Sequence, residues 1–251
     1  MGGADTELKT YSDYAAMSSA AAIDITGQIA QKPASLLSFA AGNTSLGIFE
    51  ALAGFYQAKR IDFFSCFFVA MDEWKDMSAA TPGSCGDFLQ KNFLSKVNFK
   101  PDRVRLMNGK AIDLGAECSA IRQLIESKGG IDYLLLGVGM NGHLALNEPG
   151  VDFSLSVHTT VLDEITREVG KKYFNGASPI LTGGITIGIK EICEAKKVVL
   201  SVSGTKKSSI LKMIMSEPVG NNIPATIVKQ LPQATIMCDT DAAALLNSTI
   251  P

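Results

Sequence analysis

Residues 131–150 read IDYLLLGVGMNGHLALNEPG, and this stretch decides how the rest of the chain is interpreted. A continuous apolar run leads into a G-x-G-x-x-G pattern made by Gly137, Gly139 and Gly142. Strands that are buried on both faces of a sheet have such apolar runs. In parallel sheets, ligands bind in the turns at the carboxyl ends of the strands. The stretch therefore predicts a strand followed by a ligand-facing turn, either a dinucleotide turn or a loop built for another ligand.

Apolar runs of strand length alternate with helical patterns along the whole chain. Because the runs are short, apolar on consecutive residues and separated by helices, they predict a parallel sheet covered on both faces, a three-layer α/β Rossmann-like fold. The predicted strands span residues 35–41, 65–71, 103–107, 133–139, 197–203 and 234–238. The predicted helices span residues 13–31, 45–59, 85–97, 115–128, 188–195, 205–215 and 241–247.

Composition restricts the classes of function. The chain has 251 residues, of which 46% are hydrophobic, and we expect one domain over 1–251, with 1–10 outside the ordered part. The net charge of −2 and the dispersed basic residues argue against a nucleic-acid or membrane partner. The longest apolar runs are too short to span a bilayer. Five scattered cysteines favour neither disulfides nor a zinc site, so a reducing cytoplasm is the expected location.

The glycine pattern does not fit a dinucleotide turn. Such a turn opens a long helix and is followed, about 20 residues later, by an acidic residue at the end of the next strand. Here Pro149 stops any helix soon after Gly142, and Asp163 and Glu164 lie in a polar, helix-like stretch. We therefore predict a loop from 139 to 150, in which Gly139 lets the backbone approach a small ligand.

Two turns at the predicted rim carry acid/base groups. His143 lies among the glycines with Asn141 and Glu148 nearby, and an imidazole beside a carboxylate is suited to proton transfer near neutral pH. Asp72 follows the apolar run 65–71, where partial burial can raise a carboxyl pKa. The residues alone leave a surface histidine and a helix-capping aspartate as alternatives.

A third and a fourth turn could bind an anion. Gly42, Asn43 and Thr44 precede a predicted helix, and backbone amides at a helix N-terminus bind anions. Lys207, in the turn after 197–203, could add a positive charge. A plain capping turn and a solvated lysine are the alternatives, but together the four turns indicate acid/base chemistry on a phosphorylated metabolite.

The chain resembles the glucosamine-6-phosphate deaminase/isomerase family. The similarity lies in MDEW (71–74), LMNGKAIDLGAEC (106–118), NGHLALNEPG (141–150), SGTKK (203–207) and IPATIVKQLP (223–232), in this order over nearly the whole chain. Trp74, TPGSC (81–85) and TGGITIGIK (182–190) are more similar to its galactosamine-6-phosphate branch.

The resemblance implies an aldose-ketose isomerisation coupled to loss of ammonia from a hexosamine 6-phosphate, without metal or organic cofactor. His143, oriented by Glu148 and Asn141, would open the sugar ring, and Asp72 would move a proton from C2 to C1. Residues that would bind the phosphate and sugar are Gly42, Asn43, Thr44, Gly139, Lys207 and Lys172. The partner would be a sugar phosphate, and a homo-oligomer is left open.

Some positions depart from the family pattern. Asn141 replaces an aspartate of some members, Ala41 a usual threonine, and Asn43 and Ser45 differ in the first loop. Residues 151–180 match the family poorly, so regulation is not carried over. Two alternatives stay open: a 6-phosphogluconolactonase, whose loop resembles D-G-H-x-A-S-L-F-P instead, and a sugar-phosphate sensor without turnover.

Overall fold

A parallel seven-stranded sheet forms the centre of the protein in the computed structural model, which describes residues 6–174 and 179–246. The strand order is β1-β10-β9-β6-β2-β3-β5, and all neighbours pair in parallel. These strands are β1 (Glu7–Tyr11), β2 (Leu36–Phe39), β3 (Phe67–Val69), β5 (Val104–Arg105), β6 (Tyr133–Leu136), β9 (Val198–Val202) and β10 (Ala234–Asp239).

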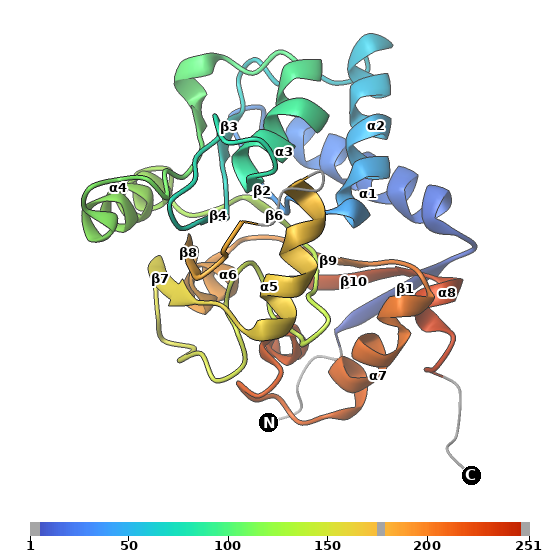
Figure 1. Cartoon of the computed structure of the whole chain (residues 1–251). Helices are drawn as coiled ribbons and strands as arrows, with labels where there is room; N and C mark the ends of the chain where they lie inside the picture. Colours follow the sequence, from blue (N-terminus) through green and yellow to red (C-terminus); the bar gives the residue numbers. More distant parts are fainter. Residues whose placement is uncertain (1–5, 175–178, 247–251) are drawn as a thin grey trace.

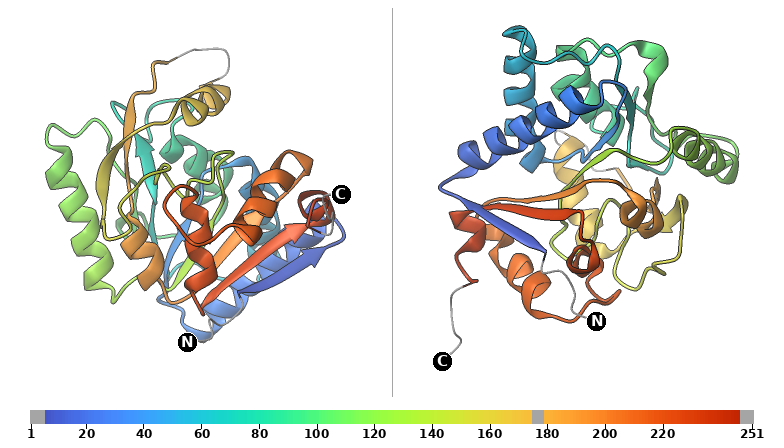
Figure 2. Two further views of the ribbon diagram at one scale, coloured as in Figure 1. Left: turned by 90° about the horizontal axis from the view of Figure 1, so that it is seen from below. Right: turned by 180° about the vertical axis from the view of Figure 1, so that it is seen from behind.

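Helices cover both faces of this sheet, as predicted. In Figure 1 and in the view from behind in Figure 2, α1, α2 and α3 lie on one side of the strands, and α6, α7 and α8 lie on the other. The α-helices are α1 (Tyr14–Gln31), α2 (Asn43–Gln57), α3 (Cys85–Asn92), α4 (Leu114–Ser127), α5 (Glu164–Gly170), α6 (Ile189–Glu194), α7 (Ser208–Ser216) and α8 (Thr240–Ala243). The 3-10 helices are η1 (Leu94–Lys96), η2 (Pro101–Arg103), η3 (Lys171–Phe174), η4 (Thr205–Lys207) and η5 (Pro224–Gln230).

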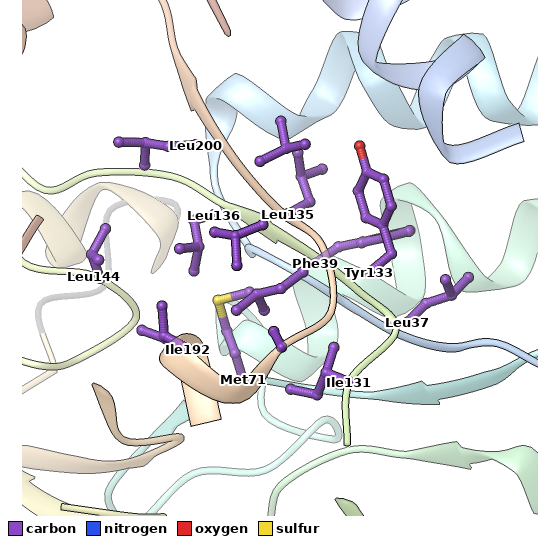
Figure 3. Close-up of a cluster of buried hydrophobic side chains, with 14 of the residues drawn as sticks. Leu37, Phe39, Met71, Ile131, Tyr133, Leu135, Leu136, Leu144, Ile192 and Leu200 are labelled. Atoms are coloured by element: carbon purple, nitrogen blue, oxygen red, sulfur yellow. The ribbon is translucent and has the colours of Figure 1, made fainter. Parts of the chain in front are cut away.

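The apolar run of the opening stretch is the middle strand. All four residues of β6 have no exposed surface, and β6 pairs with β2 on one side and β9 on the other. Side chains of these strands gather in one core with Met71, Leu144 and Ile192 (Figure 3). Each leucine buried in this way stabilises the fold by about 1.5–3 kcal/mol, so this strand anchors the fold.

Two parts of the structure differ from the sequence prediction. Residues 7–10 are not outside the ordered part, because Glu7–Tyr11 forms β1, an edge strand on β10. Its side chains are mostly exposed and polar, so no apolar run marks it. The prediction for residues 1–5 lies outside the described residues.

The second difference is a small antiparallel sheet that the sequence did not suggest. It has the order β4-β8-β7, formed by β4 (Asp72–Trp74), β8 (Gly183–Thr186) and β7 (His158–Val161). These strands are short and contain glycine, threonine and charged residues rather than apolar runs. The MDEW segment is therefore a strand of this second sheet and not only a turn after β3.

Asp132, at the start of β6, ties three segments of the fold together. Its carboxylate, which is 2% exposed, accepts hydrogen bonds from the Nζ atoms of Lys32 (2.7 Å) and Lys196 (2.7 Å) and from the Leu36 backbone N–H (2.8 Å). Burial alone would raise the pKa of Asp132, but the two lysines and the amide outweigh it and hold that pKa below its usual value.

We predict that Asp132→Asn destabilises the protein by about 1–3 kcal/mol at pH 7, because the lysines lose the charge that they share. A carboxyl whose pKa is depressed in the folded state stabilises it above the unfolded-state pKa, and this contribution is lost as the pH falls through the folded-state pKa. Urea unfolding should therefore show a difference at pH 7 that shrinks in acid. Asp102→Asn, at an exposed position, is the matched control; equal midpoints for all three proteins would contradict the prediction.

Candidate active site

The loop after β6 contains no helix, as predicted, and its glycines make room for protein groups. A Cβ atom on Gly139 would lie 2.3–2.6 Å from three atoms of the His143 ring. Gly142 has a φ of +85°, and a Cβ there would lie 2.6 Å from Ile223 Cγ2. The Gly139 N–H donates to the His143 carbonyl, so it is not free for a ligand. The glycine spacing thus lets the loop fold back on its own imidazole.

His143, Asn141 and Glu148 lie together, as the sequence analysis expected. The Asn141 Nδ2 donates to Glu148 Oε2 (2.8 Å), and the His143 Nδ1 lies 3.5 Å from the same oxygen. Burial alone would raise the pKa of Glu148, but the nearby His143 and hydrogen bonds from Asn141 and Thr166 outweigh it and hold the pKa below its usual value. Glu148 is therefore a carboxylate that can stabilise a positive charge on the imidazole.

Asp72 begins β4 and faces the same place. It is buried, its charge acts on His143, and the Cys85 thiol is hydrogen-bonded to its carboxylate. Burial raises the pKa of Asp72 to about 6, against the lowering effects of Cys85 and His143. Asp72 does not cap a helix, because Ser84 is the N-cap of α3.

The neighbouring Glu73 fixes α3 beneath this carboxylate. Its two oxygens accept the backbone N–H groups of Trp74 (2.9 Å), Cys85 (3.0 Å) and Gly86 (2.9 Å), and it is fully buried. Burial raises the pKa of Glu73 to about 7 although the three amides lower it. By holding the first turn of α3, Glu73 places the Cys85 thiol against Asp72.

Lys207 and Lys172 bring positive charge to the β6 loop. Lys207 Nζ donates to the Val138 carbonyl (2.6 Å), between Gly137 and Gly139. Burial and, to a smaller extent, the nearby charge of Lys172 lower the pKa of Lys207 to about 8. Two cations held close together are stabilised by an anion placed between them.

The predicted anion cradle is the N-terminus of α2, which begins at Asn43. Gly42 is its N-cap and provides no side-chain cap. The hydroxyl of Tyr14 donates to the carbonyls of Asn43 and Thr44 and accepts the Gly47 N–H, which fixes this first turn. The Asn43 N–H donates to the Tyr173 hydroxyl.

Four residues of this site were not among the sequence predictions. Cys85 and Glu73 surround Asp72, whereas Thr166 and Tyr173 come from the segment that matches the family poorly. Thr166 Oγ1 lies 3.0 Å from His143 Nδ1, and Tyr173 is close enough to Asp72 for that charge to act on it. For Glu73, the only indication in the sequence was its position directly after Asp72. The other contacts depend on tertiary structure and have no local signal.

Over 6–174 and 179–246, no group of three or more His, Cys, Asp or Glu side chains is placed to hold a metal ion. In the same ranges, no helix has the length and apolar character of a membrane span.

Comparisons with known proteins agree on one family. A family profile described as glucosamine-6-phosphate isomerases/6-phosphogluconolactonase matches residues 12–237. The chain is 36% identical over 234 residues to a glucosamine-6-phosphate deaminase of Thermoanaerobacter pseudethanolicus, covering 93% of this chain and 92% of the relative. It is 32% identical over 240 residues to one of Clostridium acetobutylicum, covering 96% and 100%.

Solved structures give the same result. A monomeric glucosamine-6-phosphate deaminase superposes with a TM-score of 0.92 at 30% identity, covering 96% of this chain and 100% of that one. The 6-phosphogluconolactonase of Thermotoga maritima reaches a TM-score of 0.73 at 16% identity, which shows a shared fold. With the matched profile, the relatives and the mostly parallel three-layer fold in agreement, the chain belongs to the glucosamine-6-phosphate deaminase family.

Proposed function

We propose that the protein converts a hexosamine 6-phosphate and water into a ketohexose 6-phosphate and ammonia. The observation that carries the proposal is the buried Asp72 carboxyl beside the His143–Glu148 pair. The names of the curated relatives support the same reaction class. Because Asp72 and His143 can supply the proton transfers, the reaction as proposed requires no metal or organic cofactor.

Ring opening is the first step. His143 takes the proton from the O1 hydroxyl of the sugar and gives a proton to the ring oxygen, which breaks the bond between C1 and that oxygen. The imidazole carries a positive charge between the two transfers, and the Glu148 carboxylate stabilises it. Asn141 holds Glu148 in place through its 2.8 Å hydrogen bond.

Proton transfer between carbons is the second step. Asp72 takes the proton from C2 while the substrate's ammonium group gives a proton to O1, which gives an enolamine with hydroxyl at C1 and amine at C2. Asp72 then returns its proton to C1. The resulting iminium at C2 adds water and releases ammonia, leaving the ketose. A pKa of about 6 suits this role, because the carboxyl is ionised at neutral pH yet basic enough to hold a proton briefly.

The phosphate would bind between α2 and the lysines. The Thr44 amide in the first turn of α2 offers a hydrogen-bond donor, and the Lys207–Lys172 pair offers positive charge. Fixing the phosphate holds C1 and C2 near one carboxyl, and correct positioning of this kind accounts for much of an enzyme's rate.

The first test is an ammonia-release assay with galactosamine 6-phosphate and glucosamine 6-phosphate. We expect release from at least one of them, and Asp72→Asn should lower it by at least about 100-fold because the base is lost. The segments around Trp74 and 182–190 favour galactosamine 6-phosphate, whereas the names of the relatives point to glucosamine 6-phosphate. Acid formation from 6-phosphogluconolactone, or phosphate-ester binding without turnover of either amino sugar, would overturn the proposal.

The second test is the pH dependence of kcat/KM. Since Asp72 must be ionised to accept a proton, activity should fall as the pH drops through about 6. Cys85→Ala removes a hydrogen bond that lowers the Asp72 pKa, so it should move this acid limb to higher pH. Cys118→Ala, in α4, is the control. An acid limb that stays in place in Cys85→Ala would argue against Asp72 as its origin.

The third test concerns Gly139. The Cβ of Gly139→Ala would overlap the His143 ring, so the ring must move, and a displacement of about 1 Å can cost roughly 100-fold in rate. Gly27→Ala in α1, where a Cβ meets no atom within 4 Å, should retain full activity. Steady-state kinetics with the better substrate measure both, and a fully active Gly139→Ala would refute this account of the loop.

A further inference from the structure

Thr166 is a buried polar residue of α5 whose hydroxyl reaches into the His143–Glu148 pair. Its Oγ1 lies 3.0 Å from His143 Nδ1, and Asn141 Nδ2 donates to it at 3.5 Å. The residue is 4% exposed, and its hydroxyl also hydrogen-bonds to the Glu148 carboxyl. A hydroxyl on the buried side of a short helix is unfavourable unless it is hydrogen-bonded, and all its partners belong to this one cluster.

The hydroxyl can act both as donor and as acceptor between the imidazole and the carboxylate. If Nδ1 carries the proton, it donates to Oγ1, and the Thr166 hydroxyl then donates to Glu148. The direct separation of His143 Nδ1 and Glu148 Oε2 is 3.5 Å, which is longer than a normal charge-assisted hydrogen bond. Thr166 therefore connects Nδ1 to the carboxylate through two hydrogen bonds.

We propose that Thr166 is a positioning residue that holds His143 in the Nδ1–H tautomer, which leaves Nε2 free as the base for ring opening. The inference rests on the proposed function. Nε2 takes the O1 proton, and the resulting positive charge is shared along Nδ1–H, the Thr166 hydroxyl and Glu148. Nε2 then returns a proton to the ring oxygen, so no net proton is consumed.

The proposal also gives α5 a defined place in the site. The segment from α5 to η3 carries Thr166 to His143, Lys172 to Lys207 and Tyr173 to the Asn43 amide. Phe174 at its end is buried with Trp74, Leu162 and Leu181 in a separate apolar cluster. The segment from α5 to η3 therefore contacts both His143, the ring-opening group, and the first turn of α2, the predicted anion cradle. Both parts of the site depend on the position of this segment.

Nitrogen NMR of the imidazole rings tests the tautomer without relying on turnover. The chain has only two histidines, so a His158→Gln variant assigns the spectrum. At a pH where the ring is neutral, we expect Nδ1–H in the wild type and in Thr166→Ser, which keeps a hydroxyl. In Thr166→Val, which keeps the shape, the Nε2–H form should appear. Nε2–H in the wild type, or Nδ1–H retained in Thr166→Val, would overturn the proposal.

Kinetics provide the second arm. Thr166→Val should lower kcat about tenfold or more while KM changes little, because outer hydrogen-bond partners orient a reacting group rather than bind substrate. Thr166→Ser should restore most of kcat. Thr26→Val in α1, whose hydroxyl donates to the Ala22 carbonyl of its own helix, is the matched control with wild-type kinetics.

The two proposals fail in different ways. If the wild type releases no ammonia from either amino-sugar phosphate, the proposed function is wrong. If the wild type is active and Thr166→Val has the same kcat, the role of Thr166 is wrong and the function stands. Thermal unfolding of Thr166→Val and Thr166→Ser shows whether each variant is folded. If Thr166→Val is misfolded, Thr166→Ser decides the question. A folded Thr166→Ser with a kcat far below that of the wild type would overturn the proposal.

Discussion

The contact of the His143 ring with the Cα of Gly139 is the constraint on which the site depends. The ring occupies the volume that any side chain at 139 would fill, and the Gly139 N–H donates to the His143 carbonyl. These contacts require a loop that turns back on itself within five residues. A helix starting at Gly139 would instead place the residue at 143 one turn further on, with its side chain pointing outward from the helix axis and not back onto residue 139. The absence of a helix after β6 is thus the condition for placing an imidazole at the carboxyl edge of the sheet.

The small antiparallel sheet brings distant acid groups to that imidazole. β4 begins with Asp72 directly after the core residue Met71, and it pairs with β8 more than a hundred residues later. Glu73 uses its buried carboxylate to hold the first turn of α3 against this strand. A base buried between a strand and a helix N-terminus loses most contact with water, and this desolvation raises its pKa to about 6.

The sequence predicted those parts of the fold that bury apolar runs. The six runs at 35–41, 65–71, 103–107, 133–139, 197–203 and 234–238 became β2, β3, β5, β6, β9 and β10. It did not predict β1, β4, β7 or β8, because edge strands and glycine-rich strands gain stability from pairing and have no apolar pattern of their own. Likewise, His143 and Glu148 were found because they lie five residues apart in one loop. Thr166 reaches His143 from α5, and Cys85 reaches Asp72 from α3; such contacts exist only after folding.

Charge is separated across the site, and this separation suits a substrate with a phosphate at one end and an amine at the other. Lys207 and Lys172 lie on the side of the Val138 carbonyl, whereas Asp72 and Glu148 lie around His143. Burial is the main cause of the lowered pKa of Lys207, and the charge of Lys172 adds to it, so the phosphate of the proposed substrate would stabilise both cations. Binding energy from this remote group can then offset the cost of placing a reacting carbon beside a desolvated carboxylate. In the proposed reaction, the phosphate end of the substrate would supply binding free energy, and the buried acid groups would use it for proton transfer.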